Sequence, residues 1–431
     1  MHRAFWTLIC ASGTTLLGFS QEPSAVNPAN TAWLLLSSAL VMLMVPGLAI
    51  FYGGMVRSKN VLSTLMHSIV ALALVSLVWV VIGYSLSFGT DRGGFIGGLD
   101  WLFLRGVGTA PNPDYVPDVP HLAFMAFQLM FAVLTPALIS GAFAERMNFS
   151  AFVVFIVLWS LAVYCPLAHW VWGVGGWLRE MGVLDFAGGT VVHINSGFAG
   201  LAAALLLGRR NGFPHEPILP NNIALSVLGA GLLWFGWFGF NAGSALASGE
   251  LAAVAFANTH IAAATAVLGW GLVEFLRVRK VTALGAVSGS IAGLVAITPA
   301  AGFVQPASAI LIGLTAGALC YGAVNLKTRL GYDDSLDVFG IHGVAGLIGA
   351  LLTGVFATTV VNPAGANGLL YGGVDLFLKQ ALGAGVSALY AFVVSAGILW
   401  LIDKFIGLRV HEEVEHTGLD LILHGEKSYN F

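Results

Sequence analysis

Eleven long apolar stretches constrain this 431-residue chain more than any other feature of its sequence. A membrane-spanning helix needs roughly 20 consecutive apolar residues. Stretches of that kind lie near residues 31–55, 61–88, 121–144, 149–172, 188–207, 221–244, 251–275, 284–303, 307–326, 336–356 and 374–402. Backbone polar groups in lipid are satisfied only within helices or a closed barrel, and these runs are too continuous for barrel strands. The sequence therefore predicts an all-α, polytopic membrane protein with eleven transmembrane helices.

The composition supports a membrane protein and excludes several other classes. Hydrophobic residues make up 58% of the chain and charged residues 9%, against roughly 25% charged residues in a soluble domain. The net charge of −3 leaves no basic surface for a polyanion, so nucleic acid is excluded as a partner. Cys10, Cys165 and Cys320 show neither paired nor metal-binding spacing. We expect a lipid bilayer as the surroundings, and no cofactor or metal.

The first twenty residues have the pattern of a secretory signal peptide. His2 and Arg3 precede an apolar run over residues 4–17, and small residues follow it. An additional transmembrane helix is the alternative, but this run is shorter than the roughly 20 residues that a span needs. The expected division is a cleaved signal peptide (1–20), a membrane domain (21–403) and a C-terminal tail (404–431).

Lysine and arginine are distributed unevenly between alternate loops, and this asymmetry indicates orientation. One set of loops and the tail together hold Arg57, Lys59, Arg146, Arg209, Arg210, Arg277, Arg279, Lys280, Lys327, Arg329, Lys404, Arg409 and Lys427. The other loops hold only Arg92, Arg105, Arg179 and Lys379. The positive-inside rule therefore predicts that the N-terminus lies outside the cell and the tail in the cytoplasm.

Small residues recur every four positions in two of the predicted spans, which is typical of faces where helices pack closely. These ladders are Gly285, Gly289 and Gly293 in the eighth span, and Gly346, Ala350 and Gly354 in the tenth. Lining of a pore by backbone is the alternative, which the spacing alone does not support. We expect both ladders to be packing faces.

Two histidines lie inside predicted spans, where an ionisable residue is costly and indicates a functional site by default. His193 lies in the fifth span and His342 in the tenth, the last helices of two successive five-helix groups. If these groups are inverted repeats followed by a final helix, the two imidazoles meet near the membrane midplane. The alternatives are hydrogen-bonded packing residues, or metal ligands that lack a carboxylate or cysteine to complete the site.

Asp185 and Asp337 lie at the beginning of the same two helices. A carboxylate at this position caps free backbone N–H groups and opposes the positive end of the helix dipole. Asp185 faces the predicted outer side, so attraction of a cation toward an entrance is an alternative role for it. The sequence does not separate these two roles.

Aromatic residues supply a further signal near the middle of the third predicted span and near the outer ends of the fourth and sixth. Phe131 lies in the third span, Trp172 ends the fourth, and Phe240 and Ser244 lie near the end of the sixth. Aromatic faces attract compact cations, and a hydroxyl oxygen accepts hydrogen bonds from them. Ordinary core or membrane-interface packing is the alternative.

Several segments together resemble the Amt/Mep/Rh ammonium transporter family over about residues 30–430. They are PGLAIFYGGMVRSKNVL (46–62), GAFAERMNFSA (141–151), LDFAGGTVVHIN (184–195), WFGFNAGSA (237–245), DVFGIHGVAGLIG (337–349) and GLRVHEEVEHTGLD (407–420) with HGE (424–426). Rh members generally lack the tryptophan and serine that match Trp172 and Ser244. The chain therefore resembles a bacterial Amt-type member.

The resemblance implies a role for each candidate residue. Trp172, Phe131, Phe240 and Ser244 match the outer ammonium-recruiting site, and Phe131 with Phe240 also matches the phenyl gate below it. His193 and His342 match the twin histidines of a hydrophobic pore, and Asp185 matches an acidic residue needed for transport.

The resemblance also implies partners and a location. It implies a homotrimer in the inner (plasma) membrane that carries ammonium or ammonia through one pore per subunit. A cytosolic PII-type regulator is a further implied partner. The tail departs from the family pattern at His411, which stands where that pattern leads us to expect proline.

Two other functions compete with transport. An ammonium sensor or receptor signalling through the tail is the alternative to a transporter, and flux separates the two. An intramembrane enzyme needs a nucleophile beside a base, and Ser244 has no sequence neighbour that suggests activation. We therefore expect a transporter and no enzymatic activity.

Overall fold

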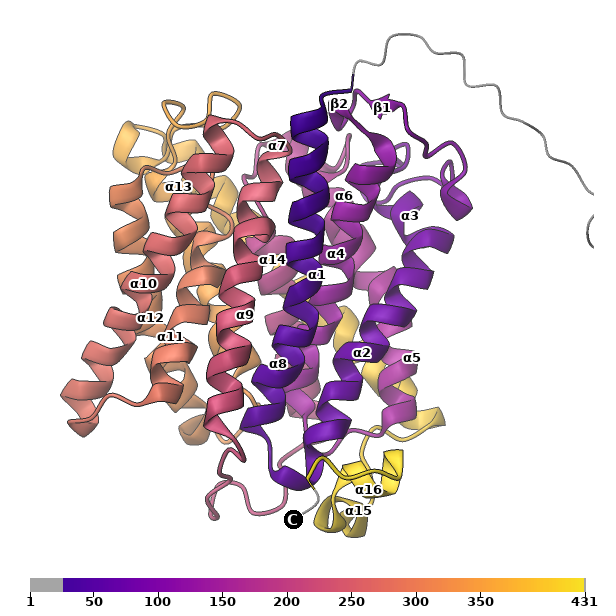
Figure 1. The fold of residues 1–431 in the computed structure, drawn as a ribbon, viewed down its shortest axis with the longest axis vertical. Coiled ribbons are helices and arrows are strands. Elements are labelled where there is room, and N and C mark those ends of the chain that lie inside the picture. The colour runs from indigo at the N-terminus through magenta and orange to yellow at the C-terminus, as the bar shows by residue number, and fades with distance from the viewer. Residues whose placement is uncertain (1–25, 430–431) are drawn as a thin grey trace, which may run out of the picture.

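The computed structural model describes residues 26–429, a bundle of long helices lying roughly along one axis (Figure 1). Its α-helices are α1 (Pro28–Met55), α2 (Val61–Val78), α3 (Tyr84–Phe88), α4 (His121–Phe143), α5 (Phe149–Trp159), α6 (Cys165–Trp172), α7 (Trp177–Met181), α8 (Asn195–Leu207), α9 (Ile223–Ala242), α10 (Glu250–Val278), α11 (Ala283–Ile297), α12 (Pro306–Leu330), α13 (Val344–Phe356), α14 (Val374–Phe405), α15 (Glu412–Thr417) and α16 (Leu419–His424). Two short antiparallel strands, β1 (Pro111–Asn112) and β2 (Val116–Pro120), pair in the longest loop. The predicted signal peptide, residues 1–20, lies outside the described residues.

The predicted all-α membrane architecture is confirmed. Within residues 26–429, ten helical segments are long and apolar enough to cross a membrane. The predicted span at 284–303 contains the shorter helix α11, which ends at Ile297. Pro299 follows two residues later, and a proline has no backbone N–H to donate to the helical hydrogen-bond ladder. The count of eleven spans therefore stays a prediction.

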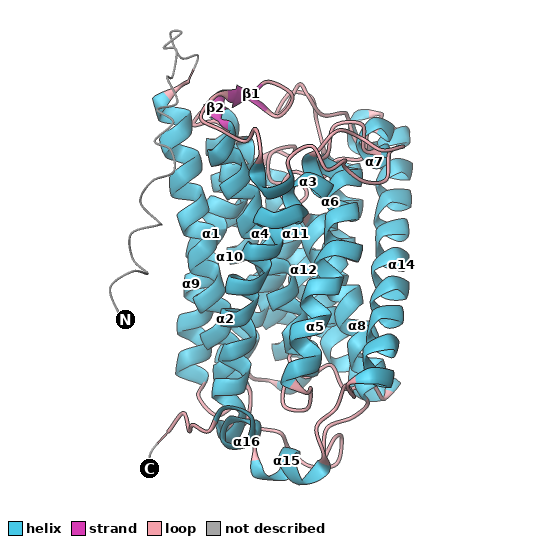
Figure 2. Ribbon diagram, turned by 90° about the vertical axis from the view of Figure 1, so that its right-hand side faces the viewer, coloured by secondary structure: helices cyan, strands magenta, loops and turns pink. Residues whose placement is uncertain are grey.

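The two ends of the bundle differ in structure (Figure 2). We call the end that carries β1, β2 and α7 the upper end, and the end that carries α15 and α16 the lower end. The loops richer in lysine and arginine lie at the lower end together with the tail. The orientation of this bundle across a membrane stays a prediction from those charges.

Single turns of π-helix occur in four of the apolar segments, inside two of them and at the start of the other two. They are η2 (Trp79–Gly83), η4 (Ser160–Tyr164), η5 (Gly189–Ile194) and η7 (Phe339–Gly343). A π turn inside a helix displaces the hydrogen-bond ladder locally and is frequent at functional sites. His193 lies in η5 and His342 in η7, so both candidate histidines occupy such turns.

The glycine ladders are packing faces, as predicted. A Cβ atom on Gly289 would lie 2.8 Å from Cβ of Trp270, and one on Gly293 would lie 2.4 Å from the Ala262 carbonyl oxygen. These contacts let α11 lie directly against α10. In the second ladder, a Cβ on Gly346 would lie 3.0 Å from the Ile194 nitrogen, so α13 packs against η5.

The C-terminal tail folds back onto the lower end of the bundle. The Asp420 carboxylate accepts a hydrogen bond from the Ser63 amide at 2.8 Å and so caps the start of α2. In return, Lys59 donates to the Glu415 carbonyl oxygen near the end of α15 at 2.9 Å. Asn60 accepts a hydrogen bond from the Leu419 amide at 2.9 Å. The tail and the membrane bundle therefore cap the ends of each other's helices.

Candidate functional site

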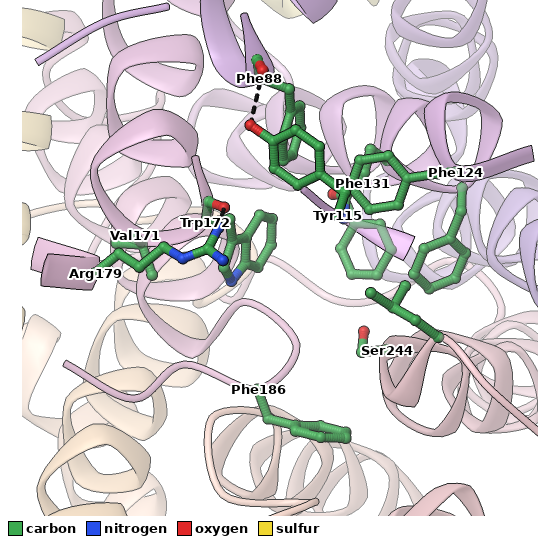
Figure 3. Close-up of a pocket in the computed structure, with 12 residues that line it drawn as sticks. Phe88, Tyr115, Phe124, Phe131, Val171, Trp172, Arg179, Phe186 and Ser244 are labelled. Atoms are coloured by element: carbon green, nitrogen blue, oxygen red, sulfur yellow. Dashed lines mark hydrogen bonds between the residues drawn. The ribbon is translucent and has the colours of Figure 1, made fainter. Parts of the chain in front are cut away.

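A cavity of about 210 Å³ opens at the upper end of the bundle (Figure 3). We call it the upper cavity. Its lining is mostly aromatic and consists of Phe88, Tyr115, Phe124, Phe127, Gln128, Phe131, Val171, Trp172, Arg179, Phe186, Ser244 and Leu246. Three of the four residues predicted for an outer site therefore line one cavity, and they come from α4, α6 and η6 (Gly243–Ala245).

Trp172 and Ser244 are held at this cavity by hydrogen bonds to backbone. The indole nitrogen of Trp172 donates to the Asp185 carbonyl oxygen at 3.0 Å. The Ser244 hydroxyl donates to the Phe240 carbonyl oxygen at 2.8 Å, which commits its proton and leaves lone pairs on its oxygen. An indole face and a hydroxyl acceptor are the groups that a small ammonium-type cation needs.

Phe131 and Phe240 form a ring pair beneath the cavity. Their ring centroids are 4.3 Å apart with an angle of 37° between the planes. The rings are only 1% and 0% exposed, so no open channel passes between them in this structure. The Trp172 ring meets Phe131 edge-on, with centroids 5.8 Å apart. The predicted gate pair is therefore brought together, directly below Trp172.

The structure also brings the two predicted histidines together. The Nδ1 atoms of His193 and His342 lie 3.2 Å apart, and the ring planes differ by 19°. A hydrogen bond between two Nδ1 atoms requires one protonated and one bare nitrogen, so the neutral rings have opposite tautomers. The Nε2 atom of His193 is buried and has no partner among the described residues. That nitrogen is free to bind a small polar guest.

The histidine pair continues the row of rings that starts at the cavity. The His193 ring lies 5.8 Å from Phe240, and Trp237 stacks on His193 at 5.3 Å with an angle of 20°. Trp237 donates its indole hydrogen to the Thr298 hydroxyl at 3.0 Å and is thereby fixed. Ring contacts therefore run unbroken from Trp172 through Phe131 and Phe240 to the imidazoles. We call this row the ring line.

Close backbone contact between two helices makes the histidine pair possible. A Cβ atom on Gly197 would lie 2.2 Å from the Gly343 nitrogen and 2.3 Å from its Cα. No side chain fits there, so only glycine allows α8 to approach η7 this closely. The distance between the imidazoles follows from that approach.

The Asp185 carboxylate caps the π turn that carries His193. One oxygen accepts from the amides of Gly188 (2.8 Å) and Gly189 (2.6 Å), and the other from Thr190 (2.8 Å) and Val191 (3.1 Å). Burial raises the pKa of this carboxyl, while the four amides lower it. The predicted capping role is therefore present in the geometry.

The corresponding prediction for Asp337 is wrong, because Asp334 caps the second histidine turn. The Asp334 carboxylate accepts from the amides of Val338 at 3.0 Å and Phe339 at 2.7 Å. Asp337 has a left-handed backbone with a φ of 62°, and its side chain forms an ion pair with Lys327 on α12. The capping carboxylate therefore lies three residues before Asp337, the residue that the sequence suggested. Asp185 and Asp334 thus cap the two turns from opposite ends of the bundle.

We expect Asp334 to make stability fall as pH rises from about 4 to 6. Burial raises the pKa of its carboxyl to about 6, against the opposing field of Lys327. In the unfolded chain an aspartate titrates near 3.9, so the unfolded state loses its proton first and is favoured progressively across this window. The difference of about 2 pKa units corresponds to at most roughly 3 kcal/mol. The measurement is the apparent Tm in detergent against pH for the wild type and Asp334→Asn. Equal slopes in both proteins would contradict this expectation.

Sequence reasoning missed several residues at the site. Gln128 is 8% exposed and lines the cavity, and its Oε1 atom has no hydrogen-bond partner among the described residues. Arg179 reaches the cavity from the short helix α7 and Phe186 from the loop after it, and hydropathy positions neither. Trp237 lies in the segment 237–245 one helical turn before Phe240, so its periodicity was a usable signal.

Among the described residues, no group of three or more His, Cys, Asp or Glu side chains is arranged to hold a metal ion.

The fold and this row of buried rings define a polytopic membrane protein of the transporter class. A sequence model of the Ammonium Transporter Family matches residues 32–429, and the chain belongs to that family.

Curated relatives and solved structures agree with this assignment. The ammonium transporter of Bacillus subtilis is 54% identical over 93% of this chain and 98% of its own length. Ammonium transporter Amt1 of Archaeoglobus fulgidus is 47% identical, over 93% of this chain and 99% of its own. The crystal structure of Saccharomyces cerevisiae Mep2 superposes with a TM-score of 0.85 at 39% identity, covering 90% of this chain and 89% of that one. A structure titled Sensor Amt Protein gives a TM-score of 0.84 at 30% identity, with coverage of 92% and 98%.

Proposed function

We propose that the chain captures ammonium in the upper cavity and passes ammonia along the ring line to the histidine pair. The continuity of contacts from Trp172 to the imidazoles carries this proposal. The upper end is then the outer face, as the charge asymmetry predicts. Membership of the ammonium transporter family supports the substrate.

Capture uses the residues that line the cavity. The ammonium ion lies against the faces of Trp172 and Phe131, where each cation–π contact contributes roughly 0.5–2 kcal/mol. The Ser244 oxygen accepts one of its hydrogens, because the serine proton is already donated to Phe240. These groups recognise charge and N–H donors together.

The ion loses a proton before it passes the phenyl gate. A bare ion in a dry interior faces a Born penalty of tens of kcal/mol. With an amine pKa of about 10, deprotonation near pH 7 requires roughly 4 kcal/mol, which is far less. The step converts ammonium into ammonia plus one proton. That proton goes either to water in the upper cavity, which makes transport electroneutral, or along the histidines, which makes it electrogenic.

Beyond the gate, the substrate is a small neutral amine. Ammonia donates to and accepts from the His193 and His342 nitrogens, which replace the water it has lost. Potassium has no proton to release and meets the full desolvation penalty inside the pore. Selectivity against alkali cations follows from that difference, and Asp185 contributes by holding His193 in its turn.

The same proposal includes partners and a location. We infer a homotrimer in the inner (plasma) membrane, with one pore per subunit. A second cavity, of about 300 Å³, lies at the lower end and is lined in part by Arg210, Glu216, Lys327 and Asp337. It is the expected inner exit and the surface that a cytosolic PII-type protein would cover.

A sensor role is the second candidate function. The likeness to the structure titled Sensor Amt Protein favours it, since that match covers 92% of this chain. The tail, docked through Asp420 and Lys59, is then the element that would report occupancy. A sensor binds ammonium without conducting it, so flux separates the two functions.

The test is current and uptake in liposomes that contain the purified protein, under an inward ammonium gradient. We expect ammonium-dependent flux in the wild type. The matched control is His193→Ala combined with His342→Ala, in which we expect flux to lose its preference for ammonium. Binding of ammonium with no flux in the wild type would contradict transport and favour the sensor.

A further inference from the structure

The upper cavity carries a positive charge at the place where a cation is expected to enter. Arg179 is the only charged residue among those that line the cavity in the described chain. It lies on α7, and its guanidinium Nη1 donates to the Trp172 carbonyl oxygen at 2.6 Å. Figure 3 shows its side chain extending to Trp172. The charge is therefore held at the rim, beside the principal cation-binding ring.

Nothing in the described structure neutralises this charge at short range. Arg179 forms no ion pair with a described residue, and no aspartate or glutamate lines the cavity. The carboxylate of Asp185 is 7% exposed, and its oxygens are occupied by four backbone amides. Asp185 therefore acts on its own helix turn more than on the cavity.

The field of Arg179 reaches another wall of the cavity. Burial raises the pKa of Tyr115 to about 12, and Arg179 is among the groups that oppose this rise. Tyr115 lies between β1 and β2, donates to the Phe88 carbonyl oxygen at 2.7 Å, and lines the same cavity. A cation between these walls experiences the guanidinium charge.

We propose that Arg179 sets the apparent affinity of the upper cavity by repelling every cation that enters it. This inference rests on the proposed function, because it needs ammonium to be captured there. The repulsion depends on charge alone, so it acts equally on ammonium and potassium. The aromatic rings and Ser244 discriminate between ammonium and potassium, because the Ser244 oxygen accepts hydrogen bonds from N–H donors. Arg179 is therefore a determinant of affinity and not of selectivity.

The proposal has a distinctive dependence on salt. Screening shortens the Debye length from about 30 Å at 0.01 M to about 3 Å at 1 M ionic strength. A cavity that attracts its substrate by charge binds it more weakly as salt rises. A cavity that repels its substrate behaves in the opposite way, so the KM for ammonium falls as salt rises.

Two substitutions separate the charge of Arg179 from its hydrogen bond to Trp172. Arg179→Gln removes the charge and keeps an N–H donor for the Trp172 carbonyl oxygen. Arg179→Lys keeps both the charge and a donor. Arg105→Gln is the matched control, because it removes an exposed positive charge that does not line the cavity.

The experiment measures initial ammonium-driven flux in neutral phosphatidylcholine vesicles, at about 10 mM and about 1 M sodium chloride. Neutral lipid removes the surface potential that otherwise concentrates cations at low salt. We expect the wild-type KM to fall about two- to fivefold with added salt. Arg179→Gln has the lower KM at low salt and changes little with added salt, while the Lys variant and Arg105→Gln follow the wild type. Maximal flux in Arg105→Gln stays that of the wild type.

Two results would overturn the inference. One is a KM in Arg179→Gln that equals or exceeds the wild-type value at low salt. The other is a Lys variant that matches the Gln variant, which would assign the effect to the guanidinium shape. Trp172→Leu is measured beside them to test the capture site itself. An unchanged KM in Trp172→Leu refutes capture at this cavity, whereas a raised KM with no effect of Arg179→Gln refutes only the role of Arg179.

Discussion

Replacing His193 and His342 together by asparagine is expected to let potassium through the protein. The imidazoles fill the end of the ring line, and they hydrogen-bond each other at 3.2 Å. Asparagine is smaller, so two such changes leave room for water between Trp237 and Phe240. Water that enters resolvates an ion and removes most of a desolvation penalty that otherwise reaches tens of kcal/mol. We expect potassium flux to increase at least tenfold.

The measurement compares potassium and ammonium flux in the same liposomes. His67→Asn is the matched control, because His67 is also a buried membrane histidine but packs against Phe143 and Phe152, away from the ring line. The control should keep its preference for ammonium. A double asparagine variant that conducts ammonium and still excludes potassium would show that selectivity lies elsewhere, with the phenyl gate as the remaining candidate.

Much of this architecture was predictable because hydropathy and sequence position constrain helices strongly. Apolar runs of spanning length leave no alternative to helices in lipid. The equivalent positions of His193 and His342 in two helix groups predict that the two residues pair, and their side chains do meet. Phe131 and Phe240 were paired through the family resemblance, and their rings are in contact.

The features that escaped prediction depend on backbone detail that hydropathy does not report. A π turn adds one residue to a helical turn without changing the apolar character of the segment. Hydropathy therefore gives no sign of the π turns η5 and η7. The cap by Asp334 escaped prediction for the same reason. The backbone at Asp337 is left-handed, and the carboxylate of Asp334, not that of Asp337, accepts from the free amides. Arg179 lines the cavity from the five-residue helix α7, whose position hydropathy does not report.

Asp185→Ala is the second substitution for which we expect a large effect. The carboxylate satisfies four backbone amides at the start of η5, and each buried donor left without an acceptor costs roughly 1–3 kcal/mol. We expect a loss of roughly 4 kcal/mol in stability, because water and local relaxation satisfy part of the turn. His193 lies in the same turn, so its hydrogen bond to His342 is lost with it. Maximal flux should fall at least tenfold.

Asp185→Asn distinguishes the capping role of Asp185 from attraction of a cation. Asparagine keeps one carbonyl oxygen, which still accepts from two of the four amides, but it removes the negative charge. Because the carboxylate is buried and does not line the upper cavity, capping predicts a graded loss of maximal flux and of Tm, with Ala worse than Asn and KM little changed. Attraction of the ion predicts instead that both variants raise KM equally while Asn keeps its Tm. Flux against ammonium concentration, measured with Tm on the same preparations, decides between these roles.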